Sequence, residues 1–110
     1  MDTSRFPVTS SGGRTLVRLA GEVDVFSAGA LRQALDLARH RHGGDVEVLA
    51  RDVTFMDSAT VHLLVHAQRR LRTEGRLLRV VSPSSTVLRV LELTGAERLY
   101  GEPGPVAAAP

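Results

Sequence analysis

The chain contains no cysteine, so a disulfide framework and a thiolate metal site are both excluded. Aromatic residues are scarce: tryptophan is absent, and one Tyr and three Phe offer little to stack against the bases of a nucleic acid. No apolar run approaches the roughly 20 residues of a membrane-spanning helix. No apolar signal region follows residues 1–5. We therefore expect a soluble cytoplasmic protein with no nucleic-acid partner and no membrane insertion.

Lysine is absent as well, so all 14 basic residues are arginines, set against 12 acidic ones. The formal net charge is only +2, yet the sequence pI is about 10.4. Because there is no lysine to lose its proton near pH 10, the small positive excess persists to very high pH. The high pI therefore overstates how basic the protein is and does not by itself indicate nucleic-acid binding.

A chain of 110 residues is long enough for one hydrophobic core and too short for two. We expect residues 1–100 to form a single domain. Residues 101–110 are rich in Pro, Ala and Gly, which predicts a disordered C-terminal tail.

Hydrophobic periodicity predicts alternating strands and helices after an N-terminal hairpin. The hairpin turn is predicted at the Ser/Gly cluster of residues 10–13, and Ser27 and Ser84 are candidate helix caps. The expected strands are 5–9, 14–20, 46–50 and 77–81, and the expected helices are 28–42, 58–74 and 85–94, followed by a short closing element at 96–100. Successive right-handed crossovers make the later strands parallel. The predicted fold class is α/β, a mixed sheet with an N-terminal antiparallel hairpin and then βαβ crossovers, covered by amphipathic helices.

The most informative stretch is residues 53–61, where an apolar strand stops at Asp57-Ser58 and a helical pattern begins at once. Asp is a favoured N-cap because its carboxylate accepts hydrogen bonds from the free N–H groups of the first turn. Ser58 would lie at the positive end of the helix dipole, where a phosphate group is tolerated. Taken alone, the pair favours a simple helix cap, because Asp-Ser before a helix is common.

Three blocks together resemble the STAS family, the small domains of bacterial anti-sigma factor antagonists and sulfate transporters. They are Gly-Glu-Val-Asp at residues 21–24, Phe-Met-Asp-Ser-Ala at 55–59, and Val-Leu-Arg-Val-Leu-Glu-Leu-Thr-Gly at 87–95. The blocks follow the family's order, and the resemblance extends from about Gly21 to Tyr100. Thr60 stands where the family prefers Gly, and Leu49-Ala50-Arg51 stands where the family commonly has an Asp-Leu-Ser-like triplet.

The resemblance implies an anti-sigma factor antagonist that binds an anti-sigma factor of the serine-kinase type and is switched off by phosphorylation of Ser58. It also implies a phosphatase that reverses the modification. The partner-binding residues would be Asp24, Asp57, Ser58, Ala59, Thr60 and Val61. Thr60 would stand in the position of the family Gly, either as a second candidate phosphoacceptor or as the mark of a divergent member with another partner. The alternative function is a non-switching scaffold subunit of a lipid-trafficking ABC transporter or a sensory complex.

Catalytic and metal-binding roles have little support in the sequence, and we expect no enzyme activity and no cofactor. Glu22 and Asp24 are close in sequence, but neither a nucleophile nor a metal ligand accompanies them. His62 and His66 have the spacing of a helical metal pair, but no third ligand is apparent. A cluster of arginines at the end of the central helix favours an anionic protein partner over a nucleic acid, and it comprises Arg69, Arg70, Arg72, Arg76 and Arg79.

Overall fold

A computed structural model describes residues 5–41 and 44–101 of the protein. Its sheet begins with a hairpin that turns at two glycines. Strand β1 (Val8–Ser11) pairs antiparallel with β2 (Arg14–Val23). Between them Gly12 and Gly13 both have positive φ, +59° and +79°, as the tight hairpin turn that matches strand twist requires. The predicted hairpin is confirmed. Its first strand begins three residues later than expected, beyond Pro7, which has no N–H to offer a sheet.

The remaining strands join in parallel, which confirms the predicted mixed sheet. Strand β3 (Val46–Met56) pairs with β2 on one side and with β4 (Leu78–Val81) on the other, so the strand order is β1-β2-β3-β4. Both β2 and β3 run farther than predicted, because β2 continues past two register irregularities and pairs again with the end of β3. Gly21 lies at the second irregularity with φ +73°.

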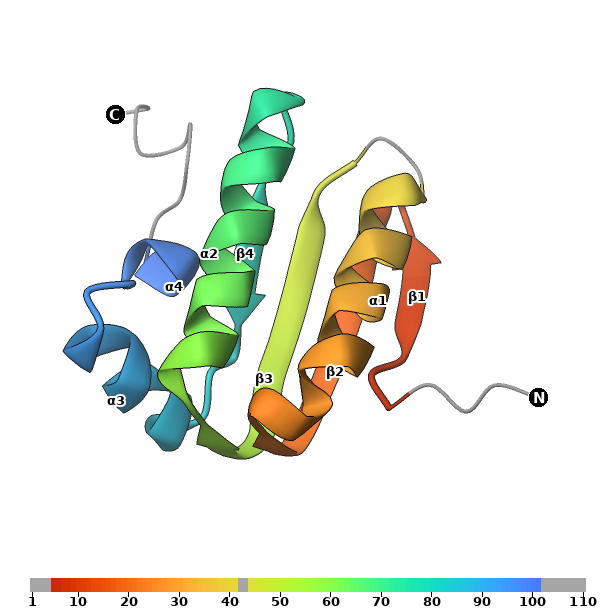
Figure 1. Cartoon of the computed structure of the whole chain (residues 1–110). Coiled ribbons are helices and arrows are strands. Elements are labelled where there is room, and N and C mark those ends of the chain that lie inside the picture. Colours follow the sequence, from red (N-terminus) through yellow and green to blue (C-terminus); the bar gives the residue numbers. More distant parts are fainter. Residues whose placement is uncertain (1–4, 42–43, 102–110) are drawn as a thin grey trace.

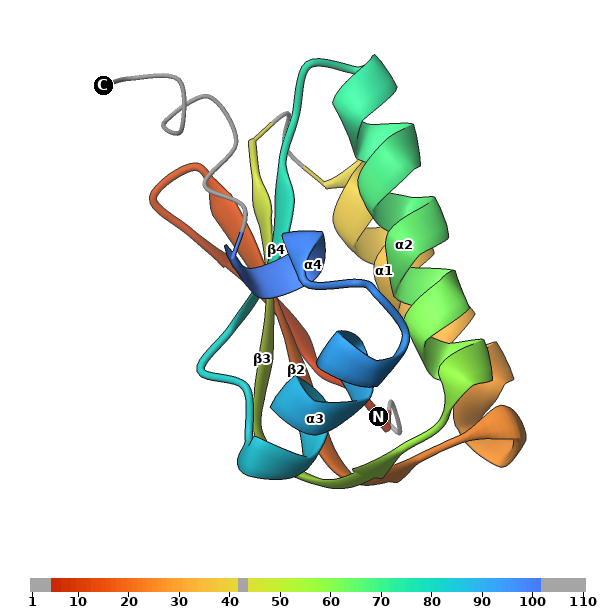
Figure 2. The same cartoon turned by 90° about the vertical axis from the view of Figure 1, so that its left-hand side faces the viewer.

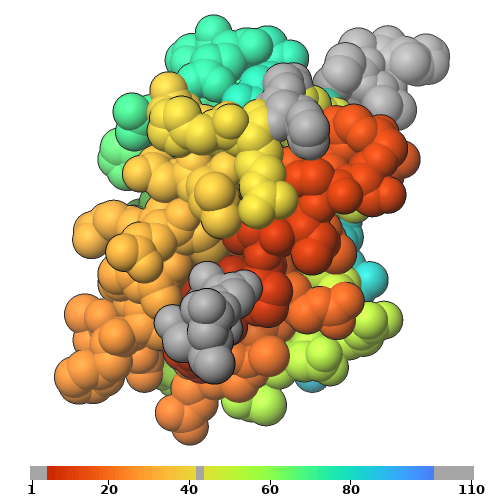
Figure 3. Space-filling model, turned by 90° about the vertical axis from the view of Figure 1, so that its right-hand side faces the viewer, coloured from red at the N-terminus to blue at the C-terminus, as the bar shows by residue number. Residues whose placement is uncertain are grey.

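Two long helices cover one face of the sheet, α1 (Ala28–His40) and α2 (Ser58–Thr73), and both are visible beside the nearly edge-on sheet in Figure 2. Two shorter helices follow β4: α3 (Ser85–Leu93) packs against β3, α4 (Arg98–Gly101) packs against β4, and both contact α2 (Figure 1). On another side of the molecule, α1 lies against the β1–β2 hairpin (Figure 3). The core between sheet and helices is aliphatic and includes Val17, Leu19, Leu31, Val48, Leu64, Leu91 and Leu99.

The predicted helix caps were half right. Ser84 caps α3 as expected, because its Oγ accepts a hydrogen bond from Val87 N (3.2 Å) and donates one to Val53 O (2.8 Å). Ser27 precedes α1 but caps nothing there; its hydroxyl forms hydrogen bonds with the Asp24 backbone instead. Helix α1 ends at His40, before the predicted end at residue 42, with Arg41 as its C-cap. The disordered tail was predicted from residue 101, but Gly101 is the last residue of α4; residues 102–110 lie outside the described residues. No described helix combines the length and apolar character needed to span a bilayer.

Candidate functional site

Three segments meet at one end of the sheet: the end of β2, the short 3-10 helix η1 (Val25–Ser27), and the start of α2 (Figure 1). The end of β2 and the start of α2 are joined by Thr60, whose Oγ1 lies 3.1 Å from Val23 O and 2.7 Å from Asp57 Oδ1. The contacts join β2, the residue after β3 and the first turn of α2. The predicted phosphoacceptor stretch therefore lies directly against the end of β2.

Asp57 is the N-cap of α2, as the sequence predicted. Its Oδ1 accepts a hydrogen bond from Thr60 N at 2.9 Å, in addition to the one from the Thr60 hydroxyl. Partial burial acts to raise the pKa of the Asp57 carboxyl, but the hydrogen bonds from the Thr60 side chain and backbone outweigh it, helped by the N–H groups of Val25 and of Asp57 itself. The net pKa is lower than that of an ordinary aspartate. Asp57 is thus held as an anion at the mouth of the helix.

Ser58 is the first residue of α2 and is exposed to solvent. Its hydroxyl forms no hydrogen bond with any other described residue, so it is accessible to an incoming group. The neighbouring Ala59 is exposed as well, and the small side chain leaves the approach to Ser58 open. The end of the helix that carries these two residues is also its positive end.

Thr60 and Val61 do not have the roles that the sequence suggested. Thr60 is 1% exposed and Val61 is 2% exposed, so neither side chain reaches a surface where a partner docks. The burial of Thr60 also removes it as an alternative phosphoacceptor. Both residues belong to the buried stripe that α2 turns toward the rest of the molecule, which continues through Leu64, Gln68 and Leu71. In this chain the residue at the family's Gly position fills space beneath the site and holds Asp57.

The loop before α1 contributes exposed apolar residues that the sequence analysis missed. Asp24 begins η1 with a reciprocal cap: its Oδ1 accepts from Phe26 N (3.0 Å), and Asp24 N donates to Ser27 Oγ (3.0 Å). The cap turns the next two side chains outward, leaving Val25 61% and Phe26 93% exposed. The sequence signal that could have predicted this exposure is an apolar pair flanked by Asp and Ser, both of which are capping residues.

The arginine cluster predicted from the sequence is divided in the structure. Arg69, Arg70 and Arg72 are exposed on α2, whereas Arg76 is buried and donates to Gly44 O (2.9 Å) and to Arg39 O (2.8 Å). Arg79 lies on β4, with its Nη2 3.8 Å from Glu47 Oε2. The five side chains therefore do not form one basic patch.

Within the described ranges, the side chains of the other polar candidates form no hydrogen bond with Asp57, Ser58 or Thr60. Glu22 is exposed at the end of β2, and His62 and His66 are both exposed on α2. Within the ranges 5–41 and 44–101, no group of three or more His, Cys, Asp or Glu residues is placed to hold a metal ion. The candidate site is therefore the Asp57-Ser58 end of α2 with the neighbouring η1.

A family model described as "Mlab, STAS domain" matches residues 6–101, nearly the whole of the described chain. The chain belongs to the STAS domain family. A curated relative, the anti-sigma-B factor antagonist of Bacillus subtilis (strain 168), is 32% identical over 79 residues, covering 72% of each chain. The resemblance inferred from the three sequence blocks is confirmed.

Solved structures show the same fold for this STAS domain. The anti-sigma factor antagonist SpoIIAA in its unphosphorylated form superposes with a TM-score of 0.74 at 22% identity, covering 94% of this chain and 92% of that one. The Bacillus cell fate determinant SpoIIAA in the phosphorylated form gives a TM-score of 0.67 at 21% identity, with coverages of 94% and 96%. The mixed sheet and its helices are thus those of the STAS fold.

Proposed function

We propose that this STAS domain is an anti-sigma factor antagonist that binds an anti-sigma factor of the serine-kinase type. Phosphorylation of Ser58 by that partner ends the binding, and a phosphatase restores it. The relatives' names support the antagonist role, since a curated relative is an anti-sigma-B factor antagonist and a fold neighbour is known in a phosphorylated form. The protein itself catalyses no reaction in this scheme; it is the kinase's substrate and ligand.

The observation that carries the proposal is the position of the Ser58 hydroxyl. It is exposed and forms no hydrogen bond within the described chain, and it lies at the N-terminus of a 16-residue helix. A kinase can reach it without opening the fold, and the helix dipole stabilises a phosphate placed there. The modified monomer therefore remains folded.

The negative charge of Asp57 explains how the modification would abolish docking. A phosphoserine carries about −1.5 to −2 charges at pH 7, and here it would lie beside a carboxylate whose pKa is already lowered. Within a desolvated interface, charge that the partner does not match costs several kcal/mol, which corresponds to a loss of affinity of about 100-fold or more. No large conformational change is needed for such a switch.

The docking surface would combine this polar site with the apolar loop beside it. Phe26 and Val25 are the exposed apolar side chains of η1, and the Val25 N–H faces the Asp57 carboxylate, which places the loop next to Ser58. Exposed aromatic residues are favoured anchors in protein interfaces. A kinase bound over Phe26 would have Ser58 within its footprint, so recognition and phosphorylation would use one surface.

The proposal is tested by incubating the protein with ATP, Mg²⁺ and each candidate serine kinase from the same genome, and locating phosphate by mass spectrometry. Ser58→Ala should bind the kinase but accept no phosphate. Ser85→Ala is the matched control, because Ser85 is also the exposed first residue of a helix, α3. Undiminished phosphorylation of the Ser58→Ala protein would reject the assignment.

The scaffold function makes the opposite prediction in the same experiment. A non-switching subunit of a transporter or sensory complex would stay bound to its partner whether or not ATP is present. Co-purification with an ABC-type ATPase, together with no phosphate on Ser58, would replace the antagonist function with the scaffold function.

A further inference from the structure

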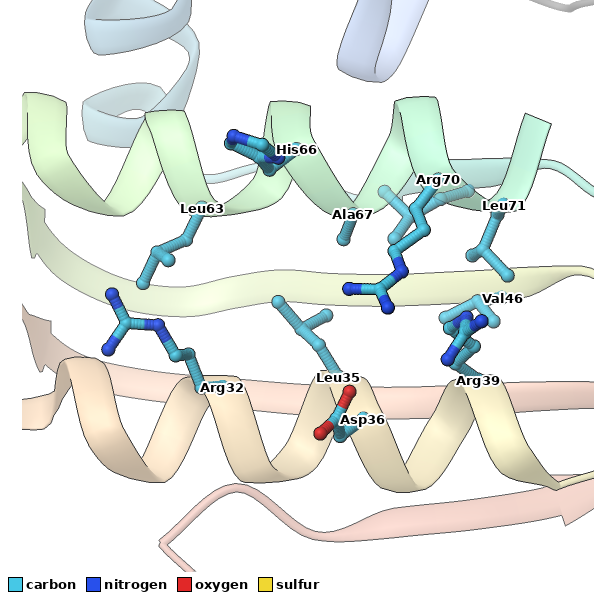
Figure 4. Close-up of a pocket in the computed structure, with 11 residues that line it drawn as sticks. Arg32, Leu35, Asp36, Arg39, Val46, Leu63, His66, Ala67, Arg70 and Leu71 are labelled. Atoms are coloured by element: carbon cyan, nitrogen blue, oxygen red, sulfur yellow. The ribbon is translucent and has the colours of Figure 1, made fainter. Parts of the chain in front are cut away.

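A cavity of about 370 Å³ opens between α1 and α2, away from Ser58 (Figure 4). Small-molecule sites in proteins usually measure about 300–1,000 Å³, so the cavity has room for a small ligand. None of its lining residues belongs to the Asp57–Thr60 segment or to η1. The cavity is therefore separate from the candidate site around Asp57 and Ser58.

The interior of the cavity is aliphatic. Leu35 of α1 and Leu63 of α2 project toward each other above β3, and Ala67 and Leu71 continue the α2 wall (Figure 4). Val46, which is 1% exposed, lies at the base. A ligand that enters between the helices would thus exchange water for contact with hydrocarbon side chains.

The rim of the cavity is cationic. Arg32 and Arg39 of α1 and Arg70 of α2 line it, and Asp36 is the only carboxylate among the lining residues. Arg39 forms an ion pair with Glu74, with Nη2 and Oε2 2.8 Å apart. Arg32 and Arg70 have no ion pair with any other residue in the described ranges. Figure 4 shows the Arg70 guanidinium extended from α2 across the opening.

The lining of the cavity indicates the chemistry of its ligand. An aliphatic interior suits a hydrocarbon chain, and a rim that carries Arg32 and Arg70 suits an anionic head group. The two together match an amphiphile with a negative charge at one end.

We propose that the groove between α1 and α2 binds a single-chain amphiphile with an anionic head, namely a free medium-chain fatty carboxylate. The acyl chain lies along Leu35, Leu63 and Ala67, and the carboxylate is bound by Arg70, with Arg32 at the other end of the groove as the alternative cation. A guanidinium binds a carboxylate through two parallel hydrogen bonds, which gives the head its specificity. The proposal is independent of the phosphorylation of Ser58.

The test is a calorimetric titration of the full chain with dodecanoate, kept below the concentration at which it forms micelles. We expect dodecanoate to bind saturably with one-to-one stoichiometry. Arg70→Gln should weaken its affinity at least about tenfold. Ala67→Leu should abolish binding, because the larger side chain fills the groove while leucine remains a good helix former. Arg89→Gln is the matched control, since Arg89 is exposed on α3 and does not line the cavity. This variant should bind as the unmodified protein does.

Three further ligands make the result decisive. Dodecylamine has the same chain with a cationic head and should not bind, whereas equal affinity would show a merely apolar site and overturn the proposal. An acidic amphipathic peptide that binds where dodecanoate fails, or binding only to phosphatidylglycerol vesicles, would overturn it as well. Should Ala67→Leu unfold, NMR shifts of the Leu35 and Leu63 methyl groups on adding dodecanoate replace that arm; unmoved methyl groups refute the site.

Discussion

Replacing Thr60 by Val isolates the hydroxyl that lies between the Asp57 carboxylate and the end of β2. Val keeps the branched shape of the side chain, so the buried space stays filled. It removes a donor that lies 2.7 Å from Asp57 Oδ1 and 3.1 Å from Val23 O. A hydroxyl has one proton and donates to one of these acceptors at a time, and the shorter distance and the negative charge favour the carboxylate.

The expected loss of stability follows from that assignment. A hydrogen bond to a charged group contributes about 1.5–3 kcal/mol to folding, and a buried acceptor deprived of its donor costs a similar amount. We therefore expect Thr60→Val to lower the free energy of unfolding by about 2 kcal/mol. For a domain of this size, that corresponds to a fall in Tm of roughly 8–16 °C. The pKa of Asp57 should rise toward the ordinary aspartate value, because its side-chain donor is gone.

Urea denaturation and calorimetry measure the stability, and carboxyl-detected NMR titration measures the pKa of Asp57. Thr60→Ser is the matched control: it loses a buried methyl group, at about 1 kcal/mol, but keeps the hydroxyl and should keep the lowered pKa. A Thr60→Val protein with an unchanged Tm and an unchanged Asp57 pKa would show that the hydroxyl does not support the site.

Three further perturbations test other parts of the structure. Asp57→Asn should reduce the loss of stability on acidification. The pKa of Asp57 in the folded protein lies below the ordinary value of 3.8, so its contribution to stability is complete above that pH and is lost as the pH falls through the folded pKa. Acid titration of both proteins should show a shallower dependence of unfolding free energy on pH in the variant. Arg76→Lys keeps the charge but loses the planar guanidinium that binds Glu74 and two backbone carbonyl groups. Urea denaturation should show a fall of about 1–3 kcal/mol in the free energy of unfolding; an unchanged urea midpoint would contradict this. Phe26→Ala should leave the free energy of unfolding within about 0.5 kcal/mol of the original, since the ring is 93% exposed. It should weaken binding to the proposed anti-sigma partner by about 2 kcal/mol; unaltered affinity by calorimetry would remove Phe26 from the proposed docking surface.

Local rules were enough to predict most of the fold. The Gly12-Gly13 turn, the Asp57 and Ser84 caps and the aliphatic stripes of the helices each depend on residues within a few positions of one another. Such features can be read from a sequence because their causes are short-range: φ above zero favours glycine, and a free helix N–H attracts a carboxylate or hydroxyl. The predicted ends of strands failed where pairing depended on a distant strand, as with the extended β2–β3 ladder.

The candidate site divides in the same way. By itself, the sequence determined that Asp57 caps a helix and that Ser58 begins it, because both follow from adjacent residues. Only the tertiary structure decided that Thr60 turns inward to Val23, 37 residues earlier, that Arg76 is buried against the carbonyl of Arg39, and that Phe26 is left in solvent. These outcomes depend on which surfaces meet when the sheet and helices pack. A polar side chain is buried or exposed according to partners that are distant in sequence, and no local pattern encodes them.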